Sequence, residues 1–446
     1  MIVANQAAFQ SRYGAAIPIA GVFSNRLDNA GERLILEGPM REPILDFSYD
    51  DDWYPITDGS GFSLVVVNEN APLQNWGQKT HWRASGSLNG SPGQNDPAPP
   101  AIQQVIISEA LTHSDPPGPT NDVIELRNLS GAVVNIGGWF LSDDFNTPKK
   151  YRIPAGTTIA AGGFRTFSET DFNVSGGVNI PFSLSSLGDE VYLFAGDANT
   201  NLIGYFHGFE FGAQKNGVTF GRHVTSVGEE HFVSEVANTL GGANSGPLIG
   251  PVVINEFMYR PPDVLTNGAY WNNTEDEYIE LYNRSASPVN LFDSSRPSNT
   301  WKLDKAVEFT FPTNTTIPAG EFLLVVNFDP VREPAQLTAF RSKYNIPGTI
   351  PILGPYGGNL SNGDEAIALY MPDNPVTSGP DFGTVPQVLV EEIRYADSSP
   401  WPPAADGVGA SLHRRVASAY GNDPTNWVAA TRTPGAASPS GGLLRK

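Results

Sequence analysis

Short runs in which apolar and polar residues alternate recur along the whole chain. Phe309-Thr310-Phe311 and Val191-Tyr192-Leu193-Phe194 are two such runs, and in a β-strand this alternation turns one face to a core and the other to solvent. Gly, Pro, Asn or Asp bounds most runs, as is typical of turns between strands. The pattern predicts an all-β chain with about seven to nine strands in each complete unit. Helices are predicted only at 334–344 and 6–13.

Two neighbouring strands, each with one acidic residue, open a repeated unit. In one copy Ile254-Asn255-Glu256 precedes Tyr278-Ile279-Glu280-Leu281-Tyr282-Asn283, and in the other Ile107-Ser108-Glu109 precedes Ile124-Glu125-Leu126-Arg127-Asn128. Both second strands close on Asn-x-Ser, and both units end on Thr-x-Gly. Matching strands and turns follow each opening, so the recurrence predicts two complete units.

The first part of the chain matches only the later strands of this unit. Asn29-Ala30-Gly31-Glu32 corresponds to the Gly-Asp-Glu strand of the repeats, but no opening pair precedes it. The predicted division is a truncated unit at 1–95, a complete unit at 101–245 and a complete unit with longer insertions at 251–440. The missing opening strands predict that the chain begins inside a domain and that its sheet has an open edge.

Composition supports an all-β chain and excludes several classes of function. Gly 46 and Pro 38 are too many for a helical protein, whereas 40% hydrophobic residues suffice for packed cores. A formal charge of −20 without a long basic run opposes nucleic-acid binding. The absence of cysteine excludes thiolate metal sites and disulfides, and is common in bacterial exported proteins. No apolar stretch reaches the roughly 18 residues that span a membrane, and no signal peptide is visible.

The acidic residues of the opening strands are the first candidates for catalysis. Two carboxyl groups on adjacent strands could act as general acid and base, as in glycoside hydrolysis. Their recurrence in every complete unit instead favours a structural role, such as accepting backbone N–H bonds at a strand end. The six histidines have no zinc-binding spacing, and His223 and His413 are expected to be exposed on strands.

Acidic loops and tryptophans are the remaining candidates. Two sets of aspartates, one in the first unit and one in the last, could supply hard oxygen ligands for calcium. Neither set follows the EF-hand spacing. These weak candidates are Asp50, Asp52, Asp58, Asp397 and Asp406. An Asp-Gly turn in solvent is the alternative for each. Trp53, Trp82, Trp401 and Trp427 could form platforms for a sugar or peptide, or could plug the core.

The repeated unit resembles the lamin tail domain family in its bacterial form. The matching motifs include the opening strands, the Thr316-Ile317-Pro318-Ala319-Gly320 turn and the closing Asp-Gly-x-Gly of the last unit, which the middle unit lacks. The structural signature is formed by Glu109, Glu125, Asn128, Trp139, Asn255, Glu256, Glu280, Asn283, Gly407, Gly409 and Trp427. The resemblance implies tandem immunoglobulin-like β-sandwiches, two complete and one N-terminally truncated.

The resemblance also implies a function without catalysis. We expect structural or binding modules of a bacterial exported or cell-surface protein that mediate adhesion or spacing and meet protein or polysaccharide partners. One alternative is that the units are accessories of an exported hydrolase, nuclease or spore-coat-kinase-like protein. Another is a calcium-dependent carbohydrate-binding module. No cofactor is predicted, with calcium left open, and no nucleic-acid partner or membrane span is expected.

Overall fold

The computed structural model describes residues 1–59, 61–97, 104–116, 118–174, 179–266 and 268–437, without the side chains of Asp52 and Thr266. The chain divides into two compact units, one of 1–107, 124–183 and 190–210, the other of 108–123, 184–189 and 211–446. The division at 1–95, 101–245 and 251–440 stays a prediction. These three ranges are called the first segment, the middle repeat and the last repeat.

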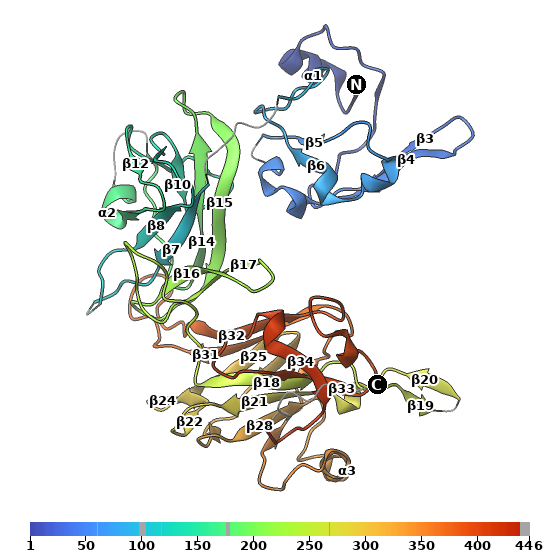
Figure 1. The fold of residues 1–446 in the computed structure, drawn as a ribbon, viewed down its shortest axis with the longest axis vertical. Helices are drawn as coiled ribbons and strands as arrows, with labels where there is room; N and C mark the ends of the chain where they lie inside the picture. Colours follow the sequence, from blue (N-terminus) through green and yellow to red (C-terminus); the bar gives the residue numbers. More distant parts are fainter. Residues whose placement is uncertain (60, 98–103, 117, 175–178, 267, 438–446) are drawn as a thin grey trace. The chain divides into compact units, whose positions relative to one another are not determined.

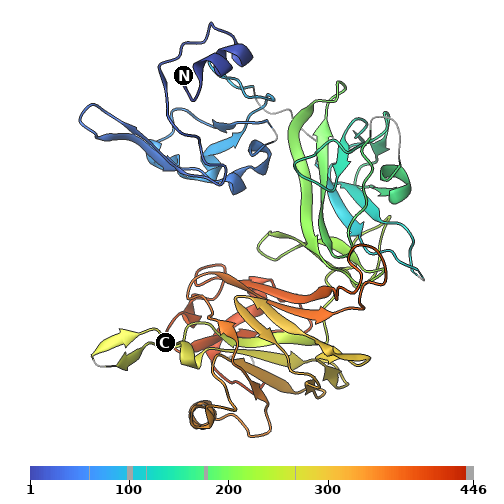
Figure 2. The ribbon, with the colours of Figure 1, turned by 180° about the vertical axis from the view of Figure 1, so that it is seen from behind.

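Two antiparallel sheets face each other in the last repeat (Figures 1 and 2). The first sheet has the order β29 (Ile352–Leu353), β28 (Phe322–Val326), β21 (Tyr278–Asn283), β18 (Val252–Met258), β33 (Ala410–Arg414) and β34 (Trp427–Thr431), with β29 parallel to β28. The second has the order β30 (Gly357–Gly358), β26 (Val307–Thr310), β25 (Lys302–Lys305), β31 (Glu365–Pro372) and β32 (Gln387–Tyr395).

The main core of the last repeat lies between these sheets. Ile254, Phe257 and Leu281 of the first sheet pack with Ile367 and Ile393 of the second. The other face of the first sheet is covered by helix α3 (Pro334–Tyr344). Short strand pairs complete the repeat: β19 (Val264–Thr266) with β20 (Ala269–Trp271), β22 (Val289–Asn290) with β27 (Thr316–Ile317), and β23 (Phe292–Asp293) with β24 (Arg296–Thr300).

The middle repeat has the same kind of strand organisation. One sheet has the order β11 (Tyr151–Arg152), β10 (Phe140–Ser142), β14 (Gly188–Gly196) and β15 (Leu202–Gly212). The other has the order β13 (Phe164–Ser168), β8 (Val123–Asn128), β7 (Val105–Leu111), β16 (Thr219–Val224) and β17 (Glu230–Ser234). Strands β9 (Val134–Asn135) and β12 (Thr158–Ile159) pair beside them, and α2 (Glu169–Phe172) follows β13.

The first segment contains only two-stranded sheets among its described residues. These are β1 (Ile2–Val3) with β2 (Gly21–Val22), β3 (Arg33–Glu37) with β4 (Pro43–Ser48), and β5 (Leu64–Val66) with β6 (Trp82–Ala84). Helix α1 (Gln6–Tyr13) follows β1. From β3 to β6 the order is hairpin, two 3₁₀ turns, strand, two 3₁₀ turns and strand; from β31 to β34 it is the same, with one 3₁₀ turn at each place.

One local turn occurs at the same place in all three parts of the chain. In each copy a backbone N–H donates to the carboxylate four residues later, with N–O distances of 3.3 Å for Asp28–Glu32, 3.0 Å for Ser185–Asp189 and 2.7 Å for Ser361–Glu365. A tyrosine hydroxyl then donates to the first residue's carbonyl, from Tyr49 to Asp28 at 2.6 Å and from Tyr395 to Ser361 at 2.9 Å. This match supports the proposal that the first segment corresponds to the end of a repeat.

The predicted fold class and both predicted helices are confirmed, whereas the number of strands is wrong. The middle repeat has eleven strands among its described residues, nine in its two larger sheets and two in the β9–β12 pair, so the prediction of seven to nine is too low. The two larger sheets of the last repeat have six and five, because β29 and β30, from the insertion after α3, each add a strand to one sheet. No helix among the described residues is long and apolar enough to cross a membrane.

Candidate functional site

The opening glutamate of the last repeat joins the first strand of the repeat to its end. Glu256 in β18 is fully buried. Its carboxylate accepts hydrogen bonds from the Ser411 hydroxyl at 2.6 Å, from the Thr433 backbone N–H at 3.1 Å and from the Tyr278 hydroxyl. Thr433 follows β34, the final strand. The bond from Thr433 therefore holds the closing segment against the opening strand.

The middle repeat contains the same connection. Glu109 in β7 is fully buried, and it accepts the Thr239 backbone N–H at 2.9 Å and the Thr239 hydroxyl at 2.7 Å. Thr239 and Thr433 are the first residues of the two closing Thr-x-Gly motifs. We call these two contacts, Glu109–Thr239 and Glu256–Thr433, the glutamate clasps. Their geometry supports a structural role for the glutamates.

Glu280 lies directly across from Glu256 on the neighbouring strand β21. It accepts the Asn255 amide at 2.7 Å and the Gly435 backbone N–H at 2.5 Å. Burial, together with the adjacent charge of Glu256, raises the pKa of Glu280 well above its usual range. Burial also raises the pKa of Glu256. Because two buried adjacent carboxyl groups do not both ionise readily, the pair shares at least one proton near neutral pH.

The asparagine of the Asn-x-Ser motif ties a strand end to a distant turn. In the last repeat the Asn283 amide donates to the carbonyls of Ser287 (2.8 Å), Ile317 (2.8 Å) and Pro318 (3.0 Å). Its side-chain oxygen accepts the backbone N–H and hydroxyl of Ser285, at 2.9 and 2.7 Å. The motif thus needs an amide, which both donates and accepts, and a hydroxyl two residues later.

The middle repeat reproduces this network bond for bond. The Asn128 amide donates to the carbonyls of Ala132 (2.7 Å), Ile159 (3.2 Å) and Ala160 (3.0 Å). Its oxygen accepts the backbone N–H and hydroxyl of Ser130, at 2.9 and 2.7 Å. Both asparagines are fully buried. We call the two networks the asparagine staples, since each fixes the end of a core strand to the Thr-Thr-Ile turn.

Ser411, His413 and Glu256 have the residue types of a hydrolytic triad, but the Ser411 hydroxyl donates to Glu256, and Glu256 lies 3.4 Å from His413 Nε2, the same nitrogen that faces Ser411. The Ser411 hydroxyl lies 2.9 Å from His413 Nε2, and all three side chains are fully buried. The prediction that His413 is exposed is wrong, because β33 is an inner strand of a sheet with both faces covered. Burial lowers the pKa of His413 to about 4, which keeps it neutral. A substrate cannot reach groups enclosed in this way, so the arrangement supports packing rather than nucleophilic attack.

A further buried carboxyl group makes stability depend on pH. Glu277, fully buried at the start of β21, accepts the Tyr356 hydroxyl and the Leu360 backbone N–H, both at 3.0 Å. Burial raises its pKa from 4.5 to about 7. The folded state therefore holds this proton more tightly than the unfolded state. The resulting stabilisation is complete below pH 4.5 and is lost as pH rises through about 7.

We expect Glu277→Gln to remove this pH dependence. The wild-type chain should lose about 2.5 kcal/mol of unfolding free energy through Glu277 between about pH 5 and pH 8, in addition to the losses from Glu256 and Glu280. Urea unfolding at the two pH values measures the difference, with the exposed Glu308→Gln as control. An equal pH slope in wild type and Glu277→Gln would contradict the assignment.

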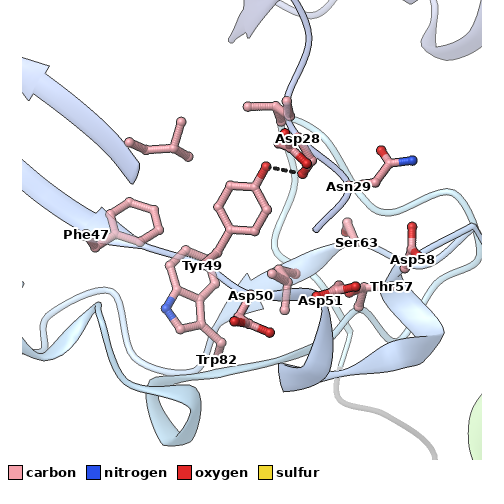
Figure 3. Close-up of a pocket in the computed structure, with 13 residues that line it drawn as sticks. Asp28, Asn29, Phe47, Tyr49, Asp50, Asp51, Thr57, Asp58, Ser63 and Trp82 are labelled. Carbon is pink, nitrogen blue, oxygen red and sulfur yellow. Dashed lines mark hydrogen bonds between the residues drawn. The ribbon is translucent and has the colours of Figure 1, made fainter. Parts of the chain in front are cut away.

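A pocket of about 400 Å³ opens in the first segment (Figure 3). Aromatic side chains line one side of it, namely Phe47, Tyr49 and Trp82, and polar side chains line the other. The polar lining consists of Asp28, Asn29, Asp50, Asp51, Thr57, Asp58 and Ser63, and the apolar lining also includes Leu27, Leu34 and Leu64. The pocket therefore combines an apolar wall with a strongly acidic rim.

The walls of the pocket are fixed by contacts behind them. Trp82 stacks on Phe47, with ring centroids 5.2 Å apart, and its indole N–H donates to the Trp76 carbonyl at 2.7 Å. Burial raises the pKa of Tyr49, so its hydroxyl stays protonated and bonded to Asp28. The ring centroids of Trp53 and Trp82 are 6.3 Å apart. These tryptophans hold the pocket wall and leave only part of their surface to a ligand.

The calcium candidates are distributed over several environments. Asp50 and Asp58 line the pocket, and the side chain of Asp52 lies outside the described ones. Asp406 forms an ion pair with Arg260 at 2.5 Å. Asp397 is partly exposed on the loop after β32. Within the described ranges, no three acidic or histidine side chains converge on a point where an ion could bind.

The remaining signature residues lie in the cores or in turns. Trp139 and Trp427 are buried, and the Trp427 indole donates to the Gly421 carbonyl at 2.6 Å. Glu125 is fully buried in β8. Gly407 and Gly409 have φ values of 70° and 91°, which glycine adopts without strain.

The sequence interpretation missed the partners of the glutamates. The sequence pattern identifies Thr239 and Thr433 only as the ends of the repeats, whereas each donates to the opening glutamate. Their co-occurrence with Glu109 and Glu256 in both complete repeats was the signal that could have paired them.

Glu277 corresponds to Asp122, the residue before β8: both are buried, and each accepts the backbone N–H of a leucine at 3.0 Å, Leu360 in the last repeat and Leu184 in the middle repeat. An acidic residue three positions before the second glutamate in both repeats was the signal that could have identified Glu277.

Comparison with known proteins agrees with these repeated features. The sequence pattern of the Lamin Tail Domain family matches residues 98–207 and 247–378, more than half of the chain. No curated protein matches the chain. Among solved structures, a DUF4876 family protein from Bacteroides thetaiotaomicron aligns with 68% of this chain and 90% of its own, at 9% identity and a TM-score of 0.25. The chain belongs to the lamin tail domain family, whose domains have an immunoglobulin-like fold.

Proposed function

We propose that the chain is a non-catalytic structural and binding part of a bacterial exported or cell-surface protein. Its sandwiches act as spacers and present surfaces for adhesion to protein or polysaccharide partners. Lamin tail domains are immunoglobulin-like modules that are generally non-catalytic. The enclosure of Glu256, Ser411 and His413 in the core supports the same conclusion.

One exposed hairpin carries the proposal of partner binding. Strands β19 and β20 project from the sheets of the last repeat (Figures 1 and 2). Leu265, Tyr270 and Trp271 on this hairpin are 60%, 73% and 63% exposed. Leu265 pairs with Tyr270 across the hairpin, which brings their side chains together. Trp271 pairs with Val264 and lies on the opposite face, so each face of the hairpin presents one exposed aromatic group. Exposed aromatic groups are typical of contact surfaces for proteins and sugars.

The double variant Tyr270→Ser/Trp271→Ser tests this function. We expect the labelled wild-type chain to bind members of a glycan or peptide array, and the double variant to bind about tenfold more weakly because it loses the aromatic contacts. The control is Phe382→Ser, which removes an aromatic side chain that is 74% exposed on another loop. Absence of binding by the wild type to both arrays, or equal binding by the double variant, would refute the proposal.

A further inference from the structure

The residues that line the pocket of the first segment are counterparts of those that surround the opening strand β18 in the last repeat. The register of the last two strands gives the correspondence: Val66 pairs with Trp82 in the first segment, and Arg414 pairs with Trp427 in the last repeat. Counting back along β5 and β33, Ser63 corresponds to Ser411 and Leu64 to Leu412. The shared turn aligns Tyr49 with Tyr395.

In the last repeat this space is filled by β18. The ring centroid of Phe257 lies 5.1 Å from that of Tyr395 and 5.2 Å from that of Trp427. In the sheet, Phe257 is the strand partner of Leu412. Glu256 accepts the Ser411 hydroxyl. The corresponding groups of the first segment, Tyr49, Trp82, Leu64 and Ser63, all line the pocket. The pocket therefore has the shape left when an opening strand is removed.

The backbone of β5 also presents the edge that such a strand needs. The Val67 N–H donates toward β6, to the His81 carbonyl at 2.8 Å, and the Ser63 carbonyl accepts the Ser85 N–H at 2.8 Å. Because alternate residues of a strand point their polar groups to opposite sides, Leu64 and Val66 point theirs away from β6. Among the described residues, β6 is the one strand paired with β5. An edge of this kind readily accepts an added strand.

An ion pair of the last repeat indicates which residue the bound strand should carry near its C-terminal end. In the last repeat Arg260, four residues after Glu256, forms the ion pair with Asp406 and accepts the Gly407 N–H at 3.2 Å through its carbonyl. Asp406-Gly407-Val408-Gly409 corresponds to Asp58-Gly59-Ser60-Gly61. Asp58 is exposed on the pocket rim. A basic residue placed four positions after the glutamate would meet it there.

We propose that the first segment binds, by β-strand addition on β5, an extended strand of a partner polypeptide. The strand carries a glutamate opposite Val65 whose carboxylate accepts the Ser63 hydroxyl, an aromatic residue between Tyr49 and Trp82, and a basic residue that pairs with Asp58. Main-chain bonds to Leu64 and Val66 give affinity, and the pocket gives specificity. This site is separate from the β19–β20 hairpin, so the two proposals fail independently.

A synthetic peptide with the sequence of residues 251–261, PVVINEFMYRP, is the probe. We expect saturable binding of the labelled peptide to the full chain by fluorescence anisotropy, together with slower amide exchange at residues 61–67. A peptide with Phe257→Asp should bind at least about tenfold more weakly, because a charge replaces the aromatic group in an apolar wall. Absence of saturable binding, or binding without protection of residues 61–67, would overturn the proposal.

A charge exchange tests the register of the bound strand. The Arg260→Glu peptide should bind the wild-type chain about fivefold more weakly, and the Asp58→Arg chain should restore its affinity. Asp58 is exposed, so this variant is expected to fold as the wild type does. Equal affinities in all four combinations would contradict the register. Self-association of the chain that the peptide blocks would overturn the assignment of the strand to a partner.

Discussion

Replacing Glu256 by alanine is expected to lower the unfolding free energy of the last repeat by about 3–5 kcal/mol. The carboxylate accepts the Ser411 hydroxyl, the Tyr278 hydroxyl and the Thr433 backbone N–H in a fully buried site. Alanine leaves these donors without an acceptor and without access to water. The loss should exceed that of a single hydrogen bond, since several desolvated groups are stranded together. Urea unfolding followed by tryptophan fluorescence measures it.

The matched control is Glu308→Ala, which removes an exposed carboxylate from β26. It should change the unfolding free energy by less than about 0.5 kcal/mol. The double variant Glu256→Ala/Glu280→Ala should also lower the melting temperature. A role confined to catalysis or ligand binding predicts unchanged stability for these variants, and that outcome would contradict the clasp.

The asparagine staple is expected to contribute about 3 kcal/mol. Asn283→Ala removes a donor shared by the carbonyls of Ser287, Ile317 and Pro318, and an acceptor used by Ser285. Asn283→Asp keeps the acceptor but places a carboxylate against three carbonyl oxygens, so it should be at least as damaging. Thermal unfolding of both variants, compared with wild type, gives the effect.

The second staple supplies an internal comparison. Because Asn128 makes the same set of bonds, Asn128→Ala should cost the middle repeat about as much as Asn283→Ala costs the last repeat. Hydrogen exchange assigns each loss to its own repeat. A large effect of one substitution beside a negligible effect of the other would show that the motif does not have the same role in both.

Local capping signals set the ends of the two predicted helices. Helix α1 begins where the Asn5 side chain accepts the Ala8 N–H at 2.9 Å, and α3 begins with Pro334 and ends at Asn345, which has a left-handed conformation. Repetition in the sequence identifies Glu109, Asn128, Glu256 and Asn283. Each of these is buried and hydrogen-bonded. These recurring residues are therefore explained by the hydrogen bonds that hold each repeat together.

The remaining features depend on contacts between distant segments. Alternation in β33 did not reveal that both faces of this strand are covered, so His413 was predicted to be exposed. The insertions gave no sign that β29 and β30 join existing sheets. The sequence predicted an open edge in the first segment, but not that Tyr49, Leu64 and Trp82 would enclose a pocket beside it. These features depend on which strands lie next to each other in a sheet. A local sequence pattern does not specify that.

Hydrogen exchange of the closing segment tests most directly whether the opening glutamates hold each repeat closed. In the wild-type chain the Thr433 amide is bonded to Glu256 and the Gly435 amide to Glu280. In Glu256→Ala, we expect residues 427–436 to exchange at least about tenfold faster, while residues 230–241 of the middle repeat keep their wild-type rates. Unchanged protection of residues 427–436 in a folded Glu256→Ala chain would contradict the glutamate clasp.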